Sequence, residues 1–365
     1  MPAIAASTVT IFYLFEIADQ VDLVALRAAI GAGAAAARFQ PKSAAPDYVQ
    51  YAAPPVVVDG EDLGVADIDG FRPRIKFFDY GVLSLALSKP FAGDWPQFIA
   101  LSQLYVENDD LERCAADVCR EVAERFAPLM QGRRTTFLAE DYLVFCVNAL
   151  DDSTTTADEL MARRGEEIAL LLRGEKHALS QQEQTELLRN RLSYLADDLV
   201  IPTWNTAFVY DTETGSHAAL EIFEFANSQL LEFRHYDDLL DTQLGRIYTT
   251  LQHPRWYDGI TGRGYIRAAR ELHSLFIDVN ELTDRTENAL KMVGDIYAAR
   301  LFNLTAARLG LARWKESVHE KLKTLDDIYR FAVEQVAISR GYLLELTIIL
   351  ILVVELVLFF LGIMR

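Results

Sequence analysis

The last segment of the chain, Tyr342–Met364, constrains the fold more than any other part of the sequence. It is strongly apolar except at Glu345, Thr347, Glu355 and Gly362. A helix of this length reaches roughly 34 Å, and a hydrocarbon core is about 30 Å thick. The many Leu, Ile, Val and Phe side chains outweigh the cost of about 2.5–3.5 kcal/mol for a carboxylate at mid-membrane. The segment therefore predicts a single transmembrane helix, with a helix buried in a soluble core or oligomer seam as the alternative.

The residues that flank this segment predict its orientation. Only Arg365 follows it, whereas four cationic residues precede it: Lys321, Lys323, Arg330 and Arg340. Cationic flanks stay on the cytoplasmic side of a membrane. The N-terminus offers no cationic leader, since the first Lys or Arg is Arg27. We therefore expect a tail-anchored, single-pass protein of the cell (inner) membrane, with the lipid bilayer as a partner and the N-terminal domain in the cytoplasm.

Composition excludes one class of partner. Lys and Arg number 35 against 53 Asp and Glu, and 35 − 53 gives a net charge of −18. Such a surface repels phosphate backbones, so we expect no direct nucleic acid binding. Hydrophobic residues make up 51% of the chain, which is enough for a sizeable core. The three cysteines are too few for a disulfide framework and fit a reducing compartment.

Residues 1–212 alternate between strand-like and helix-like patterns. They predict a mixed α+β head domain that faces the cytoplasm. We expect a hairpin within 74–87, because Asp79–Gly81 supplies a turn before alternating leucines. The other elements expected are strands at Thr8–Phe15, Val56–Val58 and Phe137–Ala149, extended chain at Leu199–Tyr210, and helices at Val21–Ile30, Gln97–Met130, 156–173 and 180–195.

Residues 213–341 have the pattern of long helices. Apolar residues recur every seven positions at Leu275, Leu282, Ala289 and Ile296, and again, after a phase shift, at Leu304, Leu311, Val318, Leu325 and Ala332. Sustained sevens favour a coiled-coil-like helical hairpin, within one chain or between chains, with a break near Gly310. We expect a homo-oligomer whose seam runs along Leu304, Leu311, Val318 and Leu325.

A carboxylate metal site is the chemical alternative that the residues suggest. Glu232 and His235, and likewise Glu316 and His319, lie three apart, as in di-iron carboxylate bundles, with Glu221 and Glu287 as further ligands. Carboxylates are so frequent here that about one such pair is expected by chance, so two are unremarkable, and a solvated helix face is the more frequent origin. No P-loop, Gly-x-Ser-x-Gly or His-Glu-x-x-His motif occurs. We therefore expect a non-enzymatic protein with no catalytic residue, cofactor or metal.

The two acidic residues of the apolar segment are the candidate functional residues. A carboxylate inside a membrane normally faces a partner helix or a wet cavity. We therefore expect Glu355, together with Glu345, to mediate intramembrane oligomerisation, with a protonated, functionless glutamate as the alternative.

Several motifs are similar to those of a known family. The run from Leu344 to Glu355, with glutamates ten apart around an apolar stretch, resembles the closing segment of the "required for meiotic nuclear division" family. Tyr297–Asn303, Ala307–Leu309 and Phe77–Val82 resemble its helical segment and strand turn. The family's Trp after Leu-Glu is Leu346 in this chain, and the absence of a presequence points to a bacterial member. The resemblance implies a membrane-anchored scaffold and carries over no catalytic residue.

These observations together favour a membrane-anchored, cytoplasm-facing scaffold or assembly factor that acts through an unidentified protein partner. The domains expected are the head at 1–212, the helical hairpin at 213–341 and the membrane helix at 342–364. A subunit of a membrane ion-transport system is one alternative, since a long cytoplasmic helix that enters a membrane is typical of magnesium channels. A carboxylate metalloenzyme is the other.

Overall fold

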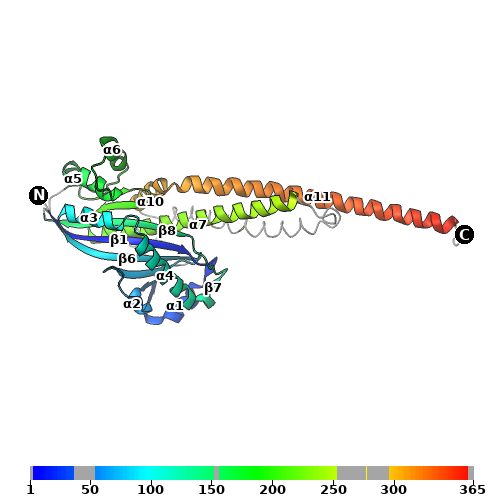
Figure 1. The fold of residues 1–365 in the computed structure, drawn as a ribbon, viewed down its shortest axis with the longest axis horizontal. Helices are drawn as coiled ribbons and strands as arrows, with labels where there is room; N and C mark the ends of the chain where they lie inside the picture. The colour runs from blue at the N-terminus through cyan, green and yellow to red at the C-terminus, as the bar shows by residue number, and fades with distance from the viewer. Residues whose placement is uncertain (1–2, 37–53, 152–155, 253–276, 278–295, 361–365) are drawn as a thin grey trace. The chain divides into compact units, whose positions relative to one another are not determined.

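A computed structural model of the chain describes residues 3–36, 54–151, 156–252, 277 and 296–360. The chain forms two compact units. The first comprises Met1–His235 and Thr286–Arg313, and the second comprises Tyr236–Arg285 and Trp314–Arg365. The sheet and the parts of the helices that cover it belong to the first unit. Figure 1 shows these elements.

An eight-stranded mixed sheet forms the centre of the first unit. Its middle strand, β1 (Ile4–Glu16), pairs with β6 (Val82–Gly93) and β8 (Ala139–Leu150), and both pairings are antiparallel. The spatial order is β3-β4-β5-β6-β1-β8-β10-β9, and among the described strands only β8 and β10 run parallel. The other strands are β3 (Ala34–Ala36), β4 (Val56–Asp59), β5 (Arg72–Phe77), β9 (Leu199–Pro202) and β10 (Thr206–Tyr210). The expected α+β class and the 74–87 hairpin are confirmed.

One face of the sheet carries the main hydrophobic core. Alternate residues of β1, from Val9 to Phe15, point into it because side chains of a strand alternate between faces. Four helices cover this face: α1 (Leu23–Ile30), α3 (Trp95–Tyr105), α4 (Asp109–Arg125) and α5 (Ala157–Arg173). Shorter elements complete the unit, namely α2 (Gly60–Leu63), α6 (Gln181–Arg189) and the small sheet of β2 (Gln20–Val21) and β7 (Met130–Gln131).

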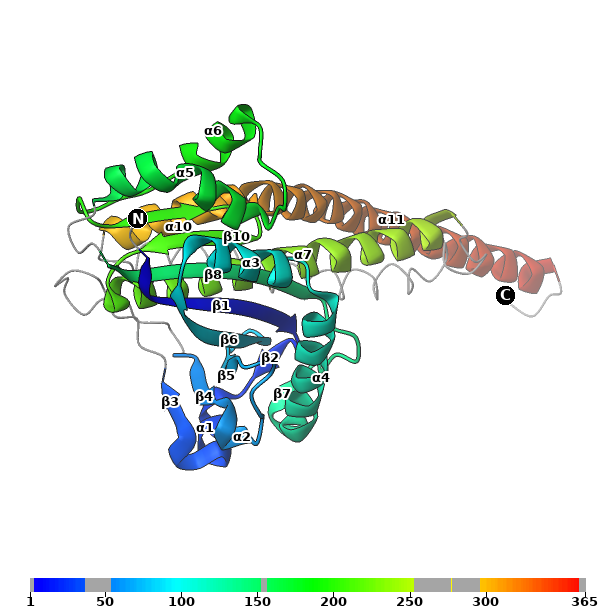
Figure 2. The same cartoon turned by 60° about the vertical axis from the view of Figure 1, so that its left-hand side comes forward.

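The opposite face of the sheet is covered by the first part of α7 (Glu213–Gln252) and by α10 (Ile296–Leu309). The rings of Tyr142 on β8 and Phe223 on α7 lie 5.5 Å apart, and those of Phe225 and Phe302 join α7 to α10 at 5.7 Å. Figure 2 shows α3 and α4 on one side of β1 and α7 on the other. The unit is therefore a three-layer arrangement with the sheet in the middle.

The expected single helix over 97–130 is wrong, because the chain breaks it into α3 and α4. Glu107 adopts a φ of 58°, a left-handed conformation that a helix cannot continue through. Asn108 then starts α4, since its side-chain oxygen accepts a hydrogen bond from the backbone N–H of Leu111 at 2.9 Å. The apolar periodicity continues across the break, which is why the pattern alone did not locate it.

The expected break near Gly310 is confirmed. Gly310 has a φ of +72° and separates α10 from α11 (Leu311–Phe360). Of the heptad residues, Leu311, Val318 and Leu325 are buried within one chain, and Leu304 is half-buried. The side chain of Ala332 lies outside the described residues, as do Leu275, Leu282 and Ala289, while Ile296 is 77% exposed.

In the second unit, α7 and α11 pack against each other through polar pairs. Ser317 donates a hydrogen bond to Asp237 at 2.7 Å, and Lys321 forms ion pairs with Asp237 at 2.8 Å and Asp241 at 2.7 Å. Two of these contacts join positions 80 apart (317 − 237 and 321 − 241), so the two helices run in the same direction along this stretch. The arms of a simple hairpin are antiparallel, so α7 and α11 are not the two arms of one.

The predicted transmembrane helix over 342–364 is wrong. Among the described residues, no helix is both long enough and apolar enough to cross a membrane. The described side chains of the apolar stretch run from Leu344 to Leu358, and this stretch includes Glu345 and Glu355. A membrane span needs about 20 predominantly apolar residues. The predicted tail anchor, its inner-membrane location with a cytoplasm-facing head, and the membrane keywords attached to them are corrected accordingly.

Candidate functional site

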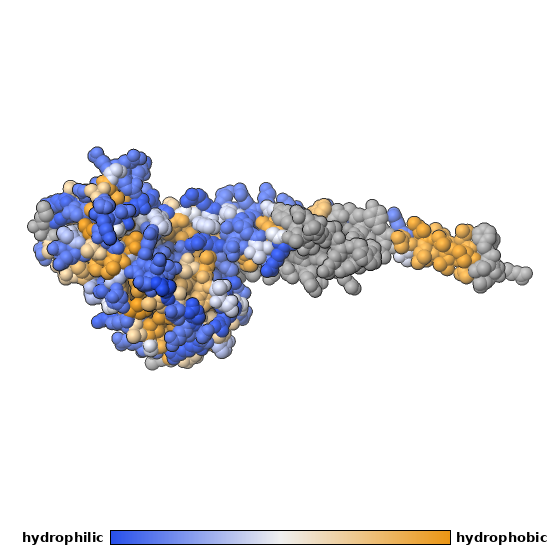
Figure 3. Space-filling view, viewed as in Figure 1, coloured by the Kyte–Doolittle hydropathy of each residue, from blue (hydrophilic) through white to orange (hydrophobic). Residues whose placement is uncertain are grey.

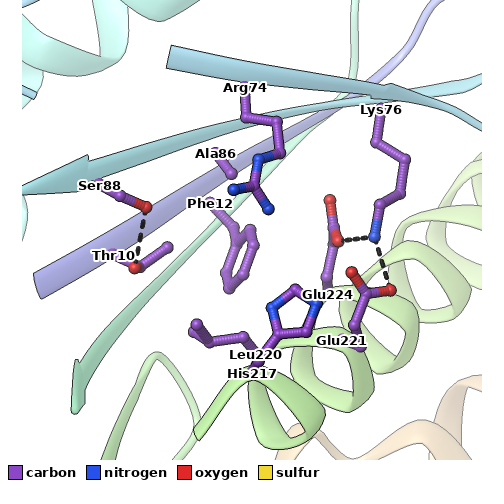
Figure 4. Close-up of a pocket in the computed structure, with 10 residues that line it drawn as sticks. All are labelled: Thr10, Phe12, Arg74, Lys76, Ala86, Ser88, His217, Leu220, Glu221 and Glu224. Carbon is purple, nitrogen blue, oxygen red and sulfur yellow. Dashed lines mark hydrogen bonds and ion pairs between the residues drawn. The ribbon is translucent and has the colours of Figure 1, made fainter. Parts of the chain in front are cut away.

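A hollow of about 400 Å³, part of it open to solvent, lies on the second face of the sheet beside the first turns of α7. The strand register explains it. Arg74 on β5, Ala86 on β6 and Phe12 on β1 stand side by side in one row, and Ser88 and Thr10 occupy the next. Ala86 and Ser88 are small, so they leave space under α7 that larger side chains would fill. Figure 4 shows the residues that surround this space.

Lys76 is the most deeply buried charged residue of the hollow, at 3% exposure. Its ammonium donates hydrogen bonds to two carboxylates of α7, Glu221 at 2.8 Å and Glu224. The two glutamates lie three apart, so they share one helix face. Burial raises the pKa of Glu224, and the Lys76 ammonium beside it acts in the opposite direction. The hollow thus contains one buried cation shared by two carboxylates.

Arg74 provides a second cation at the mouth of the hollow. Its guanidinium points toward α7 between the strands and His217 (Figure 4). Its ion pair with Asp59 is 3.7 Å long and exposed, with side-chain exposures of 52% and 75%. Exposed pairs of this kind contribute little, so the guanidinium can take another partner. Thr10 and Ser88 bond each other at 3.1 Å, and Phe12 and Leu220 supply apolar surface.

A second buried polar cluster lies on the same face, where β1 ends. Glu16 is 2% exposed, and Arg134 donates to its Oε1 from Nε at 3.1 Å and from a terminal nitrogen at 3.0 Å. Burial raises the pKa of Glu16 to about 7, with Arg134 and a hydrogen bond from the Glu232 side chain opposing the rise. Two ionised carboxylates both accept hydrogen bonds, so Glu16 and Glu232 can bond each other only when one of them carries a proton.

His235 completes this cluster from α7. The same terminal nitrogen of Arg134 that contacts Glu16 lies 2.7 Å from His235 Nε2 and 2.7 Å from Asp19. Arg donates only, so Nε2 must be unprotonated to accept that bond. Burial, with the Arg134 charge adding to it, lowers the pKa of His235 to about 4. The arrangement therefore keeps a neutral imidazole and a protonatable carboxyl about one arginine.

The solvated-face interpretation of the Glu232–His235 pair is wrong, because both side chains face the sheet. Glu232 is 2% exposed, and the side chain of His235 is 13% exposed. The other residues of the metal alternative do not gather there. Glu316 and His319 are exposed on α11, Glu221 binds Lys76, and Glu287 lies outside the described residues. Among the described side chains, no group of three His, Cys, Asp or Glu could hold a metal ion.

The sequence-predicted interaction residues are distributed over α10 and α11 and do not form one site. Val318 and Leu325 are buried against the chain itself, whereas Glu345 and Glu355 are exposed near its C-terminal end. Sequence reasoning missed Arg74 and Lys76. The sequence pattern that could have identified them is the alternation of Arg72, Arg74 and Lys76, which places three cations on one face of β5. Such a strand normally presents this face to water, and only the position of α7 makes it an inner face.

The described part of the chain thus has an α+β head, charged groups buried on one face of its sheet, and the long helices α7 and α11. The chain belongs to the family described as "Uncharacterized protein MJ0711, N-terminal domain", which matches residues 6–217. The curated relative of that name, from the archaeon Methanocaldococcus jannaschii, is 24% identical over 222 residues. The match covers 60% of this chain and 65% of the relative, so the chain spans just under two-thirds of it. No solved structure matches the chain.

These comparisons correct the family resemblance. The matched region is the head, and nothing in it supports membership of the "required for meiotic nuclear division" family. The motifs behind that resemblance were short and mostly apolar, and such runs recur in unrelated helices. The inferred bacterial origin loses its basis as well, because the relative found is archaeal.

Proposed function

We propose that this protein is a non-enzymatic scaffold that assembles through the C-terminal part of α11 and presents several copies of its head to a protein partner. The observation that carries the proposal is the apolar surface of α11. Its apolar side chains between Leu344 and Val357 are 48–67% exposed in the single chain. Exposed apolar surface of this extent marks an interaction site in proteins. Figure 3 shows apolar residues over most of the visible face of this segment.

The distribution of these side chains favours several copies over one flat partner. Leu350, Ile351, Leu352 and Val353 are consecutive and all exposed, and four consecutive residues complete about one helical turn. The segment is therefore apolar all round. A single neighbouring helix would leave its far side in water, whereas a bundle of at least three helices covers every side.

Further copies of the same helix are the occupants that this segment fits. The parallel pairing of α7 and α11 places Gln252, the last residue of α7, level with position 332 (252 + 80). The exposed stretch begins at Leu344, so it extends past the end of α7. Parallel copies would set their Glu355 side chains at one height among apolar layers. A polar position of this kind fixes the register of the helices.

The test is the mass of the purified full-length chain in solution. We expect sedimentation and light scattering to give a defined assembly of at least three copies. Ile349→Lys with Val353→Lys should reduce it to a monomer with an unchanged far-UV circular dichroism spectrum, because charges on this stretch could no longer be buried. Val24→Lys is the matched control, since Val24 is a large apolar residue of α1 that is exposed, at 83%, outside the α11 stretch. It should leave the mass unchanged.

A monomeric wild-type chain, or an assembly that the lysine variants leave intact, would overturn the proposal. So would a heterogeneous aggregate, or a chain that stays monomeric and is captured by phosphatidylcholine vesicles.

Substitutions of Glu355 provide a second test. Glu355→Gln preserves a hydrogen-bonding side chain and should preserve the number of copies, whereas Glu355→Leu should broaden the mass distribution.

A further inference from the structure

We propose that the hollow between β5 and α7 is a binding site for a small zwitterion that carries a carboxylate and an ammonium group, such as a small α-amino acid. This site is independent of assembly through α11. Every residue that lines it belongs to the first compact unit. The enclosed part of the hollow is only about 40 Å³, room for a few water-sized groups, so any ligand held there must be very small.

The charges of the hollow are separated into two regions. On the α7 side, the carboxyl groups of Glu221 and Glu224 share the single ammonium of Lys76, so this side is rich in hydrogen-bond acceptors. On the strand side, Arg74 brings a positive charge, and its long, exposed ion pair with Asp59 contributes little. A pocket with a negative and a positive region matches a ligand that has both charges close together.

The groups also suit the two ends of such a ligand. The planar guanidinium of Arg74 can hold a carboxylate with two parallel hydrogen bonds. Glu221 is only 11% exposed and uses one oxygen on Lys76, so its carboxylate can accept from an ammonium group on the side that faces the hollow. Phe12 and Leu220 lie beside these groups and would contact a small apolar side chain.

Simpler ions fit the hollow less well. A lone carboxylate ligand would bind Arg74 but would also lie close to the two glutamates. A lone ammonium ligand would bind Glu221 but would also lie close to Arg74 and Lys76. Like charges brought together in a partly desolvated site cost binding free energy. The hollow should therefore prefer the zwitterion to either half of it.

The experiment is equilibrium dialysis of the full-length chain at pH 7.5 with radiolabelled glycine, L-alanine and L-serine. We expect saturable binding of at least one of them at one molecule per chain. Acetate and methylammonium should compete at least tenfold more weakly. Arg74→Gln and Glu221→Gln should each weaken binding by at least tenfold, since each removes a charged hydrogen-bond partner. Circular dichroism would check that both variants fold.

Arg72→Gln is the matched control. Arg72 lies on the same strand and the same face, two residues before Arg74, and is exposed, but it does not line the hollow. It should leave binding within about twofold. The proposal is overturned if none of the three amino acids binds saturably, if acetate binds as well as they do, or if Arg72→Gln weakens binding as much as Arg74→Gln.

Discussion

The two faces of the eight-stranded sheet are both covered by helices, yet they bury different side chains. The face under α1, α3, α4 and α5 is lined by a continuous apolar cluster that includes Phe98, Phe145 and Trp95. The face under α7 buries ionisable residues as well, among them Glu16, Lys76, Glu224 and Glu232, each at 4% exposure or less.

This difference separates two kinds of contribution to the fold. Apolar burial stabilises the first face in rough proportion to the area removed from water, and this contribution does not depend on the protonation state of any group. Buried charges stabilise the second face only while every partner is present and in the right protonation state. The second face is therefore where pH, a ligand or a single substitution can change the protein, and both the hollow and the Glu16 cluster lie there.

The largest effect is expected from breaking the Lys76 group. Lys76→Met leaves Glu224 buried without its cation and should lower the free energy of unfolding by about 3–5 kcal/mol. Lys76→Met combined with Glu224→Met removes the charge as well as its partner and should recover most of that loss, since an apolar pair of similar volume is often as stable as an ion pair. Urea unfolding at pH 7 measures both.

Arg72→Met serves as the control on the same strand and should change stability by no more than about 0.5 kcal/mol, because Arg72 is exposed. A double variant as unstable as Lys76→Met would contradict this explanation. It would mean that packing around the lysine stem, and not the uncompensated charge, controls the stability of this face.

The next effect concerns pH and the Glu16 cluster. Glu16 has a folded pKa of about 7 against 4.5, so its contribution to stability is fully present below pH 4.5 and is lost as pH rises to 7. His235 has a folded pKa of about 4 against 6.5, so its contribution is fully present above pH 6.5 and is lost as pH falls to 4. Each change amounts to roughly 3 kcal/mol, and the two oppose each other.

Single substitutions should therefore reveal slopes that the wild-type chain conceals. Between pH 4 and 7, Glu16→Gln should make stability rise with pH, and His235→Gln should make it fall. Unfolding free energies measured at half-unit steps of pH provide the test. Parallel slopes for the two variants would show that the pKa of neither residue is shifted in the folded chain.

The smallest effect belongs to the apolar face. Asp94 caps α3, where its side chain accepts from the backbone N–H of Gln97 at 2.9 Å and Gln97 bonds back to the backbone of Asp94. Asp94→Ala should lower the unfolding free energy by about 1 kcal/mol. Asp94→Asn, which keeps the cap, should be nearly neutral. Equal losses for both would assign the effect to charge at the helix terminus instead of the hydrogen bond.

Much of the fold could be predicted from local patterns. The hairpin of β5 and β6, the strand β1 and the helix α5 were expected close to their observed positions, because alternation and capping signals act over a few residues. The break at Glu107 could not be predicted, since a single residue with positive φ leaves the apolar periodicity intact. The exposed stretch of α11 was visible in the sequence, but the environment assigned to it was wrong.

The sites follow a different rule. By itself, the sequence determined that Glu232 and His235 share a helix face and that Arg74 and Lys76 share a strand face, since both follow from periods of 3.6 and 2 residues. Only the tertiary structure decided that these faces are inner ones. Glu16 meets His235 across more than 200 positions, and Lys76 meets Glu224 across 148. Contacts at such separations depend on how the chain packs α7 onto the sheet, which no local period encodes.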